Sequence, residues 1–327
     1  MNRPLVDGFG RVHRDLRISV TDRCNFRCGY CMPAEGLDWL PRGDLLTFEE
    51  IERVARLLVE RHGIDSIRLT GGEPTLRANL PELVRLLAAL DVDLALTTNG
   101  ATLRVLAPRL RAAGLRRINV SLDSLYPERF AELTLRDDLP RVLDGIDAAL
   151  EVGFDPVKVN VVVMRGVNDD ELVDFARFGR ERGVVVRFIE FMPLDADEAW
   201  SDRSVVGQDE IVSAIHAAFP LEPVERSSAP ATRFRYADGG GEIGVVASVT
   251  RKFCDTCDRV RLTADGQFRN CLFAVDEFDL RGVLRSGAGD DELSSVLAGA
   301  VAAKWAGHGI GHVDFIRPAR SMSQIGG

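Results

Sequence analysis

The chain has 327 residues, of which 46% are hydrophobic, so it can bury a substantial core and form one or two domains. Its net charge of −9 argues against general nucleic-acid binding. The first residues contain no apolar signal-peptide region, and no apolar run reaches the roughly 18 residues that a membrane-spanning helix needs. We therefore expect a cytoplasmic protein that binds neither nucleic acid nor a membrane.

Short β-rich runs alternate with amphipathic stretches from about residue 14 to residue 194. The expected strands cover residues 16–20, 67–70, 94–98, 118–122, 157–163 and 184–189. The expected helices between them cover residues 47–61, 80–90, 103–113, 141–151 and 171–182. Six βα-type units with short links predict an α/β fold, a partial (β/α)6 barrel of the TIM type. Periodicity alone leaves a flat doubly wound sheet as an alternative.

The pattern changes after Pro193, and residues 195–235 are irregular except for a helix expected at 209–218. A β-hairpin is expected from runs at 233–236 and 243–249, followed by helical segments around 276–306 and a flexible tail. We therefore predict two domains, a partial barrel over residues 1–194 and a smaller α+β domain over residues 195–327.

The six cysteines fall into two groups of three. The first group has the spacing C-x3-C-x2-C and the second C-x2-C-x13-C, and their members are Cys24, Cys28 and Cys31, then Cys254, Cys257 and Cys271. Cytoplasmic thiols stay reduced and groups of three cannot pair internally, so metal ligation is favoured over disulfides. Three thiolates leave one iron of a [4Fe–4S] cluster open. Structural zinc, with His308 or His312 approaching in space, remains an alternative for the second group.

Basic residues on the expected strands indicate an anionic ligand. These residues are Arg17, Arg68, Lys158 and Arg187. Because the chain has neither a P-loop nor a Rossmann glycine motif, separate cations would have to hold a phosphate, and arginine suits that contact. Lys158 is one of only three lysines among 41 basic residues, which suggests that arginine does not serve there. Chance and ordinary surface ion pairs are the alternatives.

Several motifs together resemble one branch of the radical S-adenosylmethionine (SAM) superfamily, the GTP 3′,8-cyclases. The resemblance rests on residues 21–33 (TDRCNFRCGYCMP), the Gly-Gly-Glu-Pro turn at 71–74, FIEFMP at 188–193, the second cysteine group and the final Gly-Gly. It covers almost the whole chain and is weakest over residues 195–235.

The resemblance implies two [4Fe–4S] clusters, the first binding SAM and the second binding the guanine of GTP. The implied SAM contacts are Tyr30, Gly72, Ser121 and Met192. The implied GTP contacts are Arg17, Arg68, Thr97, Lys158, Arg259, Val260 and Arg261, with assistance from Arg187, Gly326 and Gly327. A 5′-deoxyadenosyl radical would take the ribose 3′ hydrogen. GTP would become (8S)-3′,8-cyclo-7,8-dihydroguanosine 5′-triphosphate in the first step of molybdenum cofactor biosynthesis.

The resemblance also implies partners: a flavodoxin- or ferredoxin-like electron donor, cyclic pyranopterin monophosphate synthase as the next enzyme, and a tendency to form homodimers. Two alternatives stay open. One is a peptide-modifying radical SAM enzyme with an auxiliary cluster, although such enzymes usually carry more than three cysteines in that domain. The other is a non-catalytic iron–sulfur or zinc protein.

Overall fold

The computed structural model describes residues 3–195, 200–225, 229–311 and 315–326. Gly327 and His312, named above, lie outside these residues. A single 12-stranded sheet runs through the described residues in the order β12-β11-β10-β1-β2-β3-β4-β5-β6-β9-β8-β7. No helix in these ranges is both long enough and apolar enough to cross a membrane.

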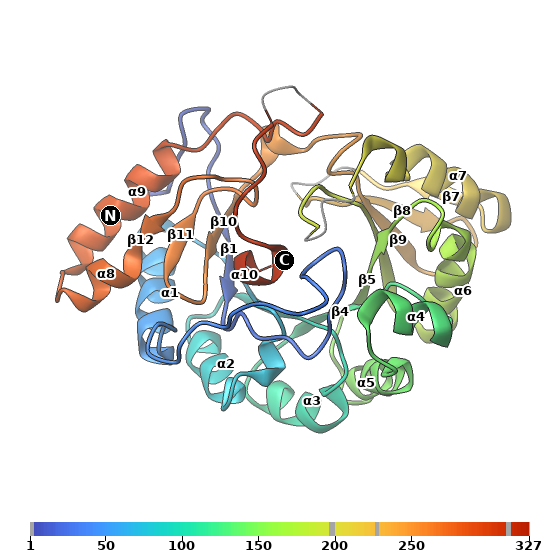
Figure 1. Cartoon of the computed structure of the whole chain (residues 1–327), viewed down its shortest axis with the longest axis horizontal. Helices are drawn as coiled ribbons and strands as arrows, with labels where there is room; N and C mark the ends of the chain where they lie inside the picture. The colour runs from blue at the N-terminus through green and yellow to red at the C-terminus, as the bar shows by residue number, and fades with distance from the viewer. Residues whose placement is uncertain (1–2, 196–199, 226–228, 312–314, 327) are drawn as a thin grey trace.

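The centre of the sheet consists of six strands that pair in chain order, all parallel. They are β1 (Asp15–Ser19), β2 (Ser66–Thr70), β3 (Asp93–Thr98), β4 (Arg117–Ser121), β5 (Val157–Val163) and β6 (Val185–Glu190). Figure 1 shows the strands curving around an open centre, with the helices on the outside. This arrangement confirms the predicted partial barrel and excludes a flat sheet with helices on both faces.

The helices of the first half follow the strands and cover the outer face of the sheet (Figure 1). They are α1 (Phe48–His62), α2 (Leu80–Ala88), α3 (Leu103–Ala112), α4 (Pro127–Thr134), α5 (Leu139–Glu151) and α6 (Leu172–Arg182). The capping box that begins α1 has both of its hydrogen bonds, between Thr47 and Glu50. The sequence did not predict α4, because this helix buries only Phe130 and Thr134 and so has no long apolar stripe.

The second half of the chain extends both edges of the same sheet. β9 (Glu242–Val246) pairs parallel with β6, and β10 (Arg259–Leu262) pairs parallel with β1. The remaining strands are antiparallel: β7 (Leu221–Pro223), β8 (Thr232–Tyr236), β11 (Gln267–Arg269) and β12 (Phe278–Asp279). The hairpin of β8 and β9 is the predicted one. The domain division at residue 194 stays a prediction, since the sheet continues through both parts.

The helices of the second half are α7 (Gln208–Ala218), α8 (Leu280–Arg285), α9 (Asp290–Ala302) and the short α10 (Met322–Ile325). In Figure 1, α10 lies inside the barrel near its centre. Ile325, expected to be apolar, is 1% exposed, whereas the flexibility expected after it is wrong for Gly326, which the fold also buries.

Residue alternation along the strands separates the core from the cavity. On β5 the four valines at 157, 159, 161 and 163 are buried in the apolar core, and each contributes about 2 kcal/mol by burial. The alternate residues Lys158, Asn160 and Val162 are only half-buried. The apolar face of each strand therefore holds the helices, and its other face supplies polar groups to the interior.

Candidate active site

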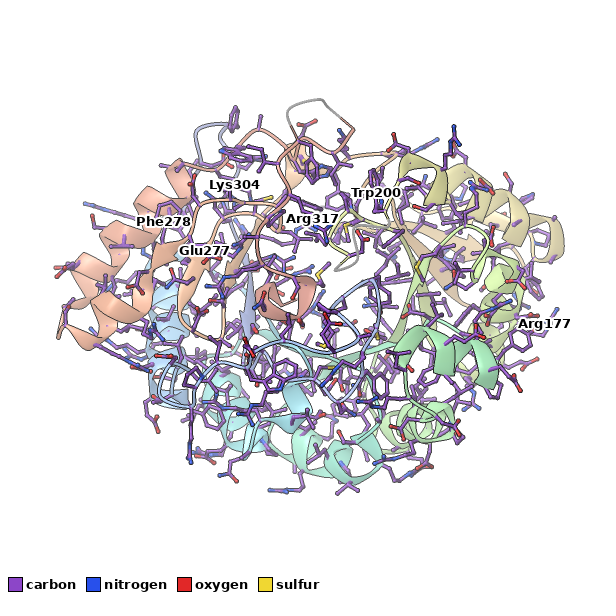
Figure 2. The ribbon with its side chains drawn as sticks, viewed as in Figure 1. Arg177, Trp200, Glu277, Phe278, Lys304 and Arg317 are labelled. Atoms are coloured by element: carbon purple, nitrogen blue, oxygen red, sulfur yellow. The ribbon has the colours of Figure 1, made fainter. Side chains whose placement is uncertain are left out.

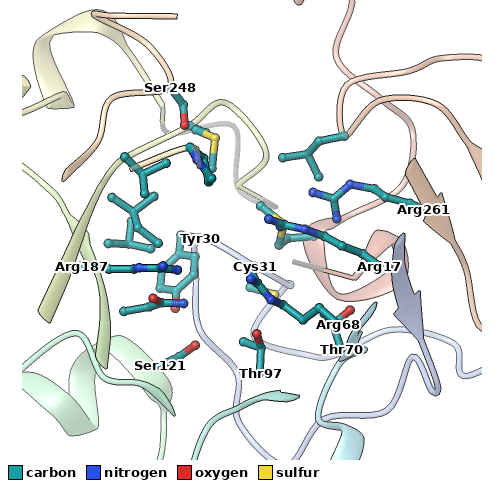
Figure 3. Close-up of a pocket in the computed structure, with 18 of the residues that line it drawn as sticks. Arg17, Tyr30, Cys31, Arg68, Thr70, Thr97, Ser121, Arg187, Ser248 and Arg261 are labelled. Atoms are coloured by element: carbon teal, nitrogen blue, oxygen red, sulfur yellow. The ribbon is translucent and has the colours of Figure 1, made fainter. Parts of the chain in front are cut away.

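A cavity of about 290 Å³ opens inside the barrel, and all six cysteines line it. The two triads therefore face one space, although more than 220 residues separate Cys31 from Cys254 in the sequence. Most of the residues predicted from the resemblance line the same cavity: Arg17, Tyr30, Arg68, Gly72, Thr97, Ser121, Arg187, Met192, Arg259 and Arg261. Figure 3 shows four of the arginines reaching inward from different strands: Arg17, Arg68, Arg187 and Arg261.

Among the residues that the structure describes, three of the predicted ones do not line the cavity. Val260 is fully buried on the opposite face of β10, so only its backbone could contact a ligand there. Lys158 lies deeper on β5 than Asn160, a cavity residue on the same face. Gly326 is connected to the cavity by Arg261, a lining residue that donates a hydrogen bond to the Gly326 carbonyl oxygen.

The first triad lies on the loop after β1, where its thiols are shielded from water. Cys24 Sγ accepts from the backbone N–H of Phe26 at 3.4 Å and faces Asn99 Nδ2 at 4.0 Å. Burial raises the pKa of Cys24 to about 11, and the nearby Glu73 carboxylate adds to the effect. Burial also raises the pKa of Cys31 to about 12. Empty of metal, these thiols are neutral, and a bound cation would be needed to deprotonate them.

The glycine pair after β2 is required by close packing of two backbone segments. A Cβ atom on Gly71 or Gly72 would overlap carbonyl oxygens of residues 21–23, which lead into the cysteine loop. The N–H of Gly72 donates to the carbonyl of Thr21 at 2.8 Å, and the N–H of Glu73 donates to that of Arg23 at 2.7 Å. The turn thus fixes the start of the cysteine loop, while Gly72 also reaches the cavity.

Tyr30 is held in place by Asp123, which the sequence did not predict as a site residue. Its hydroxyl donates to Asp123 at 2.7 Å, and Asp123 also accepts from the backbone N–H of Val162 at 2.8 Å. Burial raises the pKa of Asp123 to about 6, although these hydrogen bonds oppose the shift. Asn99 and Asp123 come just after β3 and β4, and polar residues directly after buried strands are the signal that could have identified them.

The second triad lies in a positively charged setting. Burial alone would raise the pKa of Cys257, but Arg259 and Lys304 outweigh it and lower the pKa to about 7. Arg11 donates to the carbonyl of Cys254 at 2.7 Å and so ties the N-terminal loop to this triad. His308 also lines the cavity, and the centroid of its ring lies 5.0 Å from that of the Phe273 ring. The sequence predicted His308 only as a ligand in the zinc alternative.

The structure bears on two alternatives to iron–sulfur clusters, namely disulfides and a single bound metal ion. All six cysteines are free, which removes the disulfide alternative. In the described ranges, no three His, Cys, Asp or Glu side chains converge closely enough to hold one metal ion. A [4Fe–4S] cluster differs because each thiolate binds a separate iron, so its ligands lie further apart.

The inner face of the barrel carries basic side chains without acidic partners. Along the sheet, Arg261 lies opposite Arg17, and Arg17 lies opposite Arg68. Within the described part of the chain, none of these three, nor Lys158 or Arg187, forms an ion pair with a carboxylate. The Nε atoms of Arg17 and Arg68 are buried without any hydrogen-bond partner. Buried charge without compensation is costly, so this face is suited to an anionic ligand.

These cations also depress one another's pKa values. Burial is the main cause and neighbouring positive charges add to it, while Asp15 opposes the shift at Arg17 and Arg68 and Glu242 opposes it at Lys158 and Arg187. The pKa falls to about 9 for Arg17, to about 10 for Arg68 and Arg187, and to about 7 for Lys158. An anion placed among them would relieve both effects.

Comparison with known proteins identifies the family. The model described as "Radical SAM superfamily" matches residues 18–179, and "Molybdenum Cofactor Synthesis C" matches residues 184–310. The chain is 50% identical to the GTP 3′,8-cyclase of Rhodopirellula baltica over 99% of its own length and 92% of the relative's. It is also 50% identical to the GTP 3′,8-cyclase of Streptomyces coelicolor, over 99% and 96%. The chain belongs to the GTP 3′,8-cyclase family.

Solved structures agree on the fold alone. Methylornithine synthase (PylB) superposes with a TM-score of 0.55 at 18% identity, covering 88% of this chain and 86% of that one. Streptococcus suis SuiB bound to S-adenosylmethionine gives a TM-score of 0.56 at 15% identity, covering 84% and 66%.

A radical SAM member of the GTP 3′,8-cyclase family requires a [4Fe–4S] cluster and SAM, and the first triad fits that requirement. Its three thiols supply soft donors on a loop pinned by Gly72, and they face the cavity. Buried cavity atoms without partners, Thr70 Oγ1 and Asn160 Oδ1, are available to a polar ligand. The second triad offers the same donor set at the other side of the cavity, so it fits a second cluster of the same type.

Proposed function

We propose that this chain catalyses the GTP 3′,8-cyclase reaction as a radical SAM lyase. GTP would become (8S)-3′,8-cyclo-7,8-dihydroguanosine 5′-triphosphate, the first step of molybdenum cofactor biosynthesis. The observation that carries the proposal is one cavity lined by two cysteine triads and by basic side chains without acidic partners. Family membership favours this activity over the peptide-modifying alternative.

Cys24, Cys28 and Cys31 would hold the cluster that binds SAM. When bound, the cluster and SAM supply the 5′-deoxyadenosyl radical that takes the 3′ hydrogen of GTP. The side chains proposed to contact SAM are Tyr30, Gly72, Ser121 and Met192. Asp123 fixes the Tyr30 ring through its hydroxyl, so the ring keeps one orientation beside the first triad.

Cys254, Cys257 and Cys271 would hold the second cluster, with guanine as its non-protein ligand. Arg17, Arg68, Lys158 and Arg187 would then hold the triphosphate from the barrel strands, with Thr97 and the segment 259–261 as further contacts. Arginine suits the phosphates because its planar fork donates two hydrogen bonds at once. Gly326 and Gly327 would assist, Gly326 by holding Arg261 through its carbonyl.

The proposal extends to partners and location that the fold does not address. A flavodoxin- or ferredoxin-like protein would deliver the electrons, and cyclic pyranopterin monophosphate synthase would take the product. We also propose a cytoplasmic enzyme that forms homodimers.

Anaerobic reconstitution tests the proposal. The protein should bind about eight irons per chain, and with SAM, dithionite and GTP it should release 5′-deoxyadenosine and the cyclic product. Omission of GTP is the control for uncoupled SAM cleavage. About four irons per chain would contradict the two-cluster proposal, and SAM cleavage that needs a peptide would contradict GTP as substrate.

A further inference from the structure

One buried lysine that the proposed reaction does not use lies against the second triad. Lys304 follows α9 and is 4% exposed. It is one of only three lysines in the chain, the others being Lys158 and Lys252. Figure 2 shows Lys304 where the chain leaves α9.

The Lys304 ammonium has an acceptor for each of its three protons. Its Nζ lies 2.9 Å from His13 Nε2, 2.9 Å from the carbonyl oxygen of Arg259 and 3.5 Å from Cys257 Sγ. Within the described ranges it forms no ion pair with a carboxylate. Of its three acceptors only the Cys257 sulfur can carry a negative charge, while the buried Asp7 carboxylate lies 3.8 Å from His13 Nε2.

His13 fixes the direction of the ammonium. The imidazole is fully buried, and its Nδ1 lies 3.4 Å from the carbonyl oxygen of Leu5, which can only accept. The Nδ1 atom therefore carries the proton, and Nε2 accepts from Lys304. Burial and the Lys304 charge lower the pKa of His13 to about 4, so the ring stays neutral near physiological pH. Two of the three ammonium protons are thus held by rigid acceptors, and the third is directed at the sulfur.

Lysine suits this position better than arginine does. The three acceptors lie in different directions around one nitrogen, which matches the tetrahedral ammonium and not the planar guanidinium. The chain uses arginine for nearly all its other basic residues, so the choice of lysine here fits the geometry.

We propose that Lys304 is a positioning residue of the second cluster, whose ammonium donates a hydrogen bond to the Cys257 sulfur and stabilises the reduced cluster. The inference rests on the proposed second cluster. A positive charge and a hydrogen bond to a ligating sulfur both favour the additional electron, and both raise the reduction potential. Arg259 and Arg11 add positive charge on the same side.

Redox titration followed by electron paramagnetic resonance tests the charge. The full-length protein would carry Cys24→Ala, Cys28→Ala and Cys31→Ala, so that only the second cluster gives a signal. We expect Lys304→Met to shift the potential of that cluster to more negative values, and Lys304→Gln to shift it less, since the amide keeps a donor but no charge. The matched control is Lys252→Met, because Lys252 is exposed and donates to the carbonyl of Ile310 instead of a sulfur.

A second measurement keeps the first triad intact. In otherwise wild-type protein with ¹⁵N-labelled lysine side chains, the reduced second cluster should show a hyperfine coupling to one lysine nitrogen. Lys304→Gln should abolish the coupling, and Lys252→Gln should retain it. No coupling, or an unchanged potential in Lys304→Met, at about eight irons per wild-type chain would overturn the role of Lys304 alone. About four irons would instead overturn the second cluster, and the inference with it.

Discussion

The two cysteine triads share one cavity but lie in opposite electrostatic surroundings. Carboxylates lie beside the first triad, with Glu73 acting on Cys24 and Asp123 on Cys28, and these thiols are raised in pKa. Cations lie beside the second triad, and Arg259 and Lys304 lower the pKa of Cys257. Nearby charges thus act in opposite directions on Cys24 and Cys28 and on Cys257, while burial still raises the pKa of Cys254.

This difference indicates a division of labour between two centres of the same composition. Negative charge near a cluster disfavours an added electron, which gives the low potential needed to reduce a sulfonium. Positive charge favours an added electron and also attracts an anionic nucleotide. For the proposed reaction, this difference would account for one cavity that both supplies an electron and holds a triphosphate.

The largest expected effect comes from removing one ligand of either triad. Cys28→Ser should abolish SAM cleavage, since the radical needs the first cluster. Cys257→Ser should abolish formation of the cyclic product and leave some SAM cleavage, since the first triad is intact. Chromatography of 5′-deoxyadenosine and of the nucleotide product distinguishes the two outcomes.

Iron content provides the control for these two variants, since each should keep about four irons per chain. If both variants lose SAM cleavage equally while keeping that iron, the two triads do not divide the work as proposed.

A smaller effect is expected from the basic face of the barrel. Arg68→Met should weaken GTP binding about 10- to 100-fold, because a charge-assisted contact to phosphate contributes about 1.5 to 3 kcal/mol. The same change should raise the melting temperature of the ligand-free protein, since it removes a buried charge without a partner. Equilibrium binding and thermal unfolding measure the two effects.

Arg104→Met is the matched control for Arg68→Met, because Arg104 is an exposed residue that pairs with Asp144 and Glu151. It should leave GTP binding unchanged. A lower melting temperature with unchanged GTP affinity in Arg68→Met would assign Arg68 a purely structural role.

The C-terminal tail, which contacts Thr70 and Arg261 at Gly326, should give an effect of about tenfold. In Gly326→Ala, the new Cβ would overlap Thr70 Oγ1, and the residue would keep a φ of 85°, which costs about 1 to 2 kcal/mol. The carbonyl would move away from Arg261, so kcat/KM for GTP should fall about tenfold. Gly239→Ala is the control, with a φ of 80° and open space around its Cβ. Equal activity in both variants would show that the tail does not shape the site.

The smallest effect concerns pH and Lys158. Its pKa is about 7 in the folded protein against 10.5 when unperturbed, because burial and then Arg187 disfavour the charged amine. The unfolded chain therefore binds more protons between pH 7 and 10.5, so the stability of the ligand-free protein should rise across that window. GTP favours the charged amine, so its affinity should fall across the same window. Lys158→Met should reduce both slopes in urea unfolding and in binding titrations, and parallel profiles would contradict the assignment.

Local patterns were sufficient to predict the centre of the fold. Alternating β and amphipathic runs gave the six parallel strands, because each strand buries one face against helices and the period of its side chains records that burial. Cysteine spacing predicted the two groups of three, and both line the cavity, although β10 and β11 lie between Cys257 and Cys271. An anionic ligand stays a prediction, which Arg17, Arg68, Lys158 and Arg187 favour because basic residues are unusual inside strands.

Pairing between distant segments could not be predicted in the same way. Nothing in residues 259–262 indicates that they pair with β1, about 240 residues earlier, since the hydrogen bonds of a sheet edge carry no sequence code. The sequence did not predict a site role for Lys304, for a similar reason. A basic residue just after a helix usually interacts with the helix dipole at the surface, and only the fold reveals that His13 and Cys257 surround it.

The pairing of β1 with β10 has a consequence for synthesis of the chain. At about 5 to 20 residues per second, β1 leaves the ribosome roughly 10 to 50 s before its second partner exists. During that interval one edge of the growing sheet is open, and open edges invite pairing with other chains. Asp15 and Arg17 on β1 carry charges that discourage such pairing. The arginine proposed to bind the nucleotide would thus also protect the unfinished protein from aggregation.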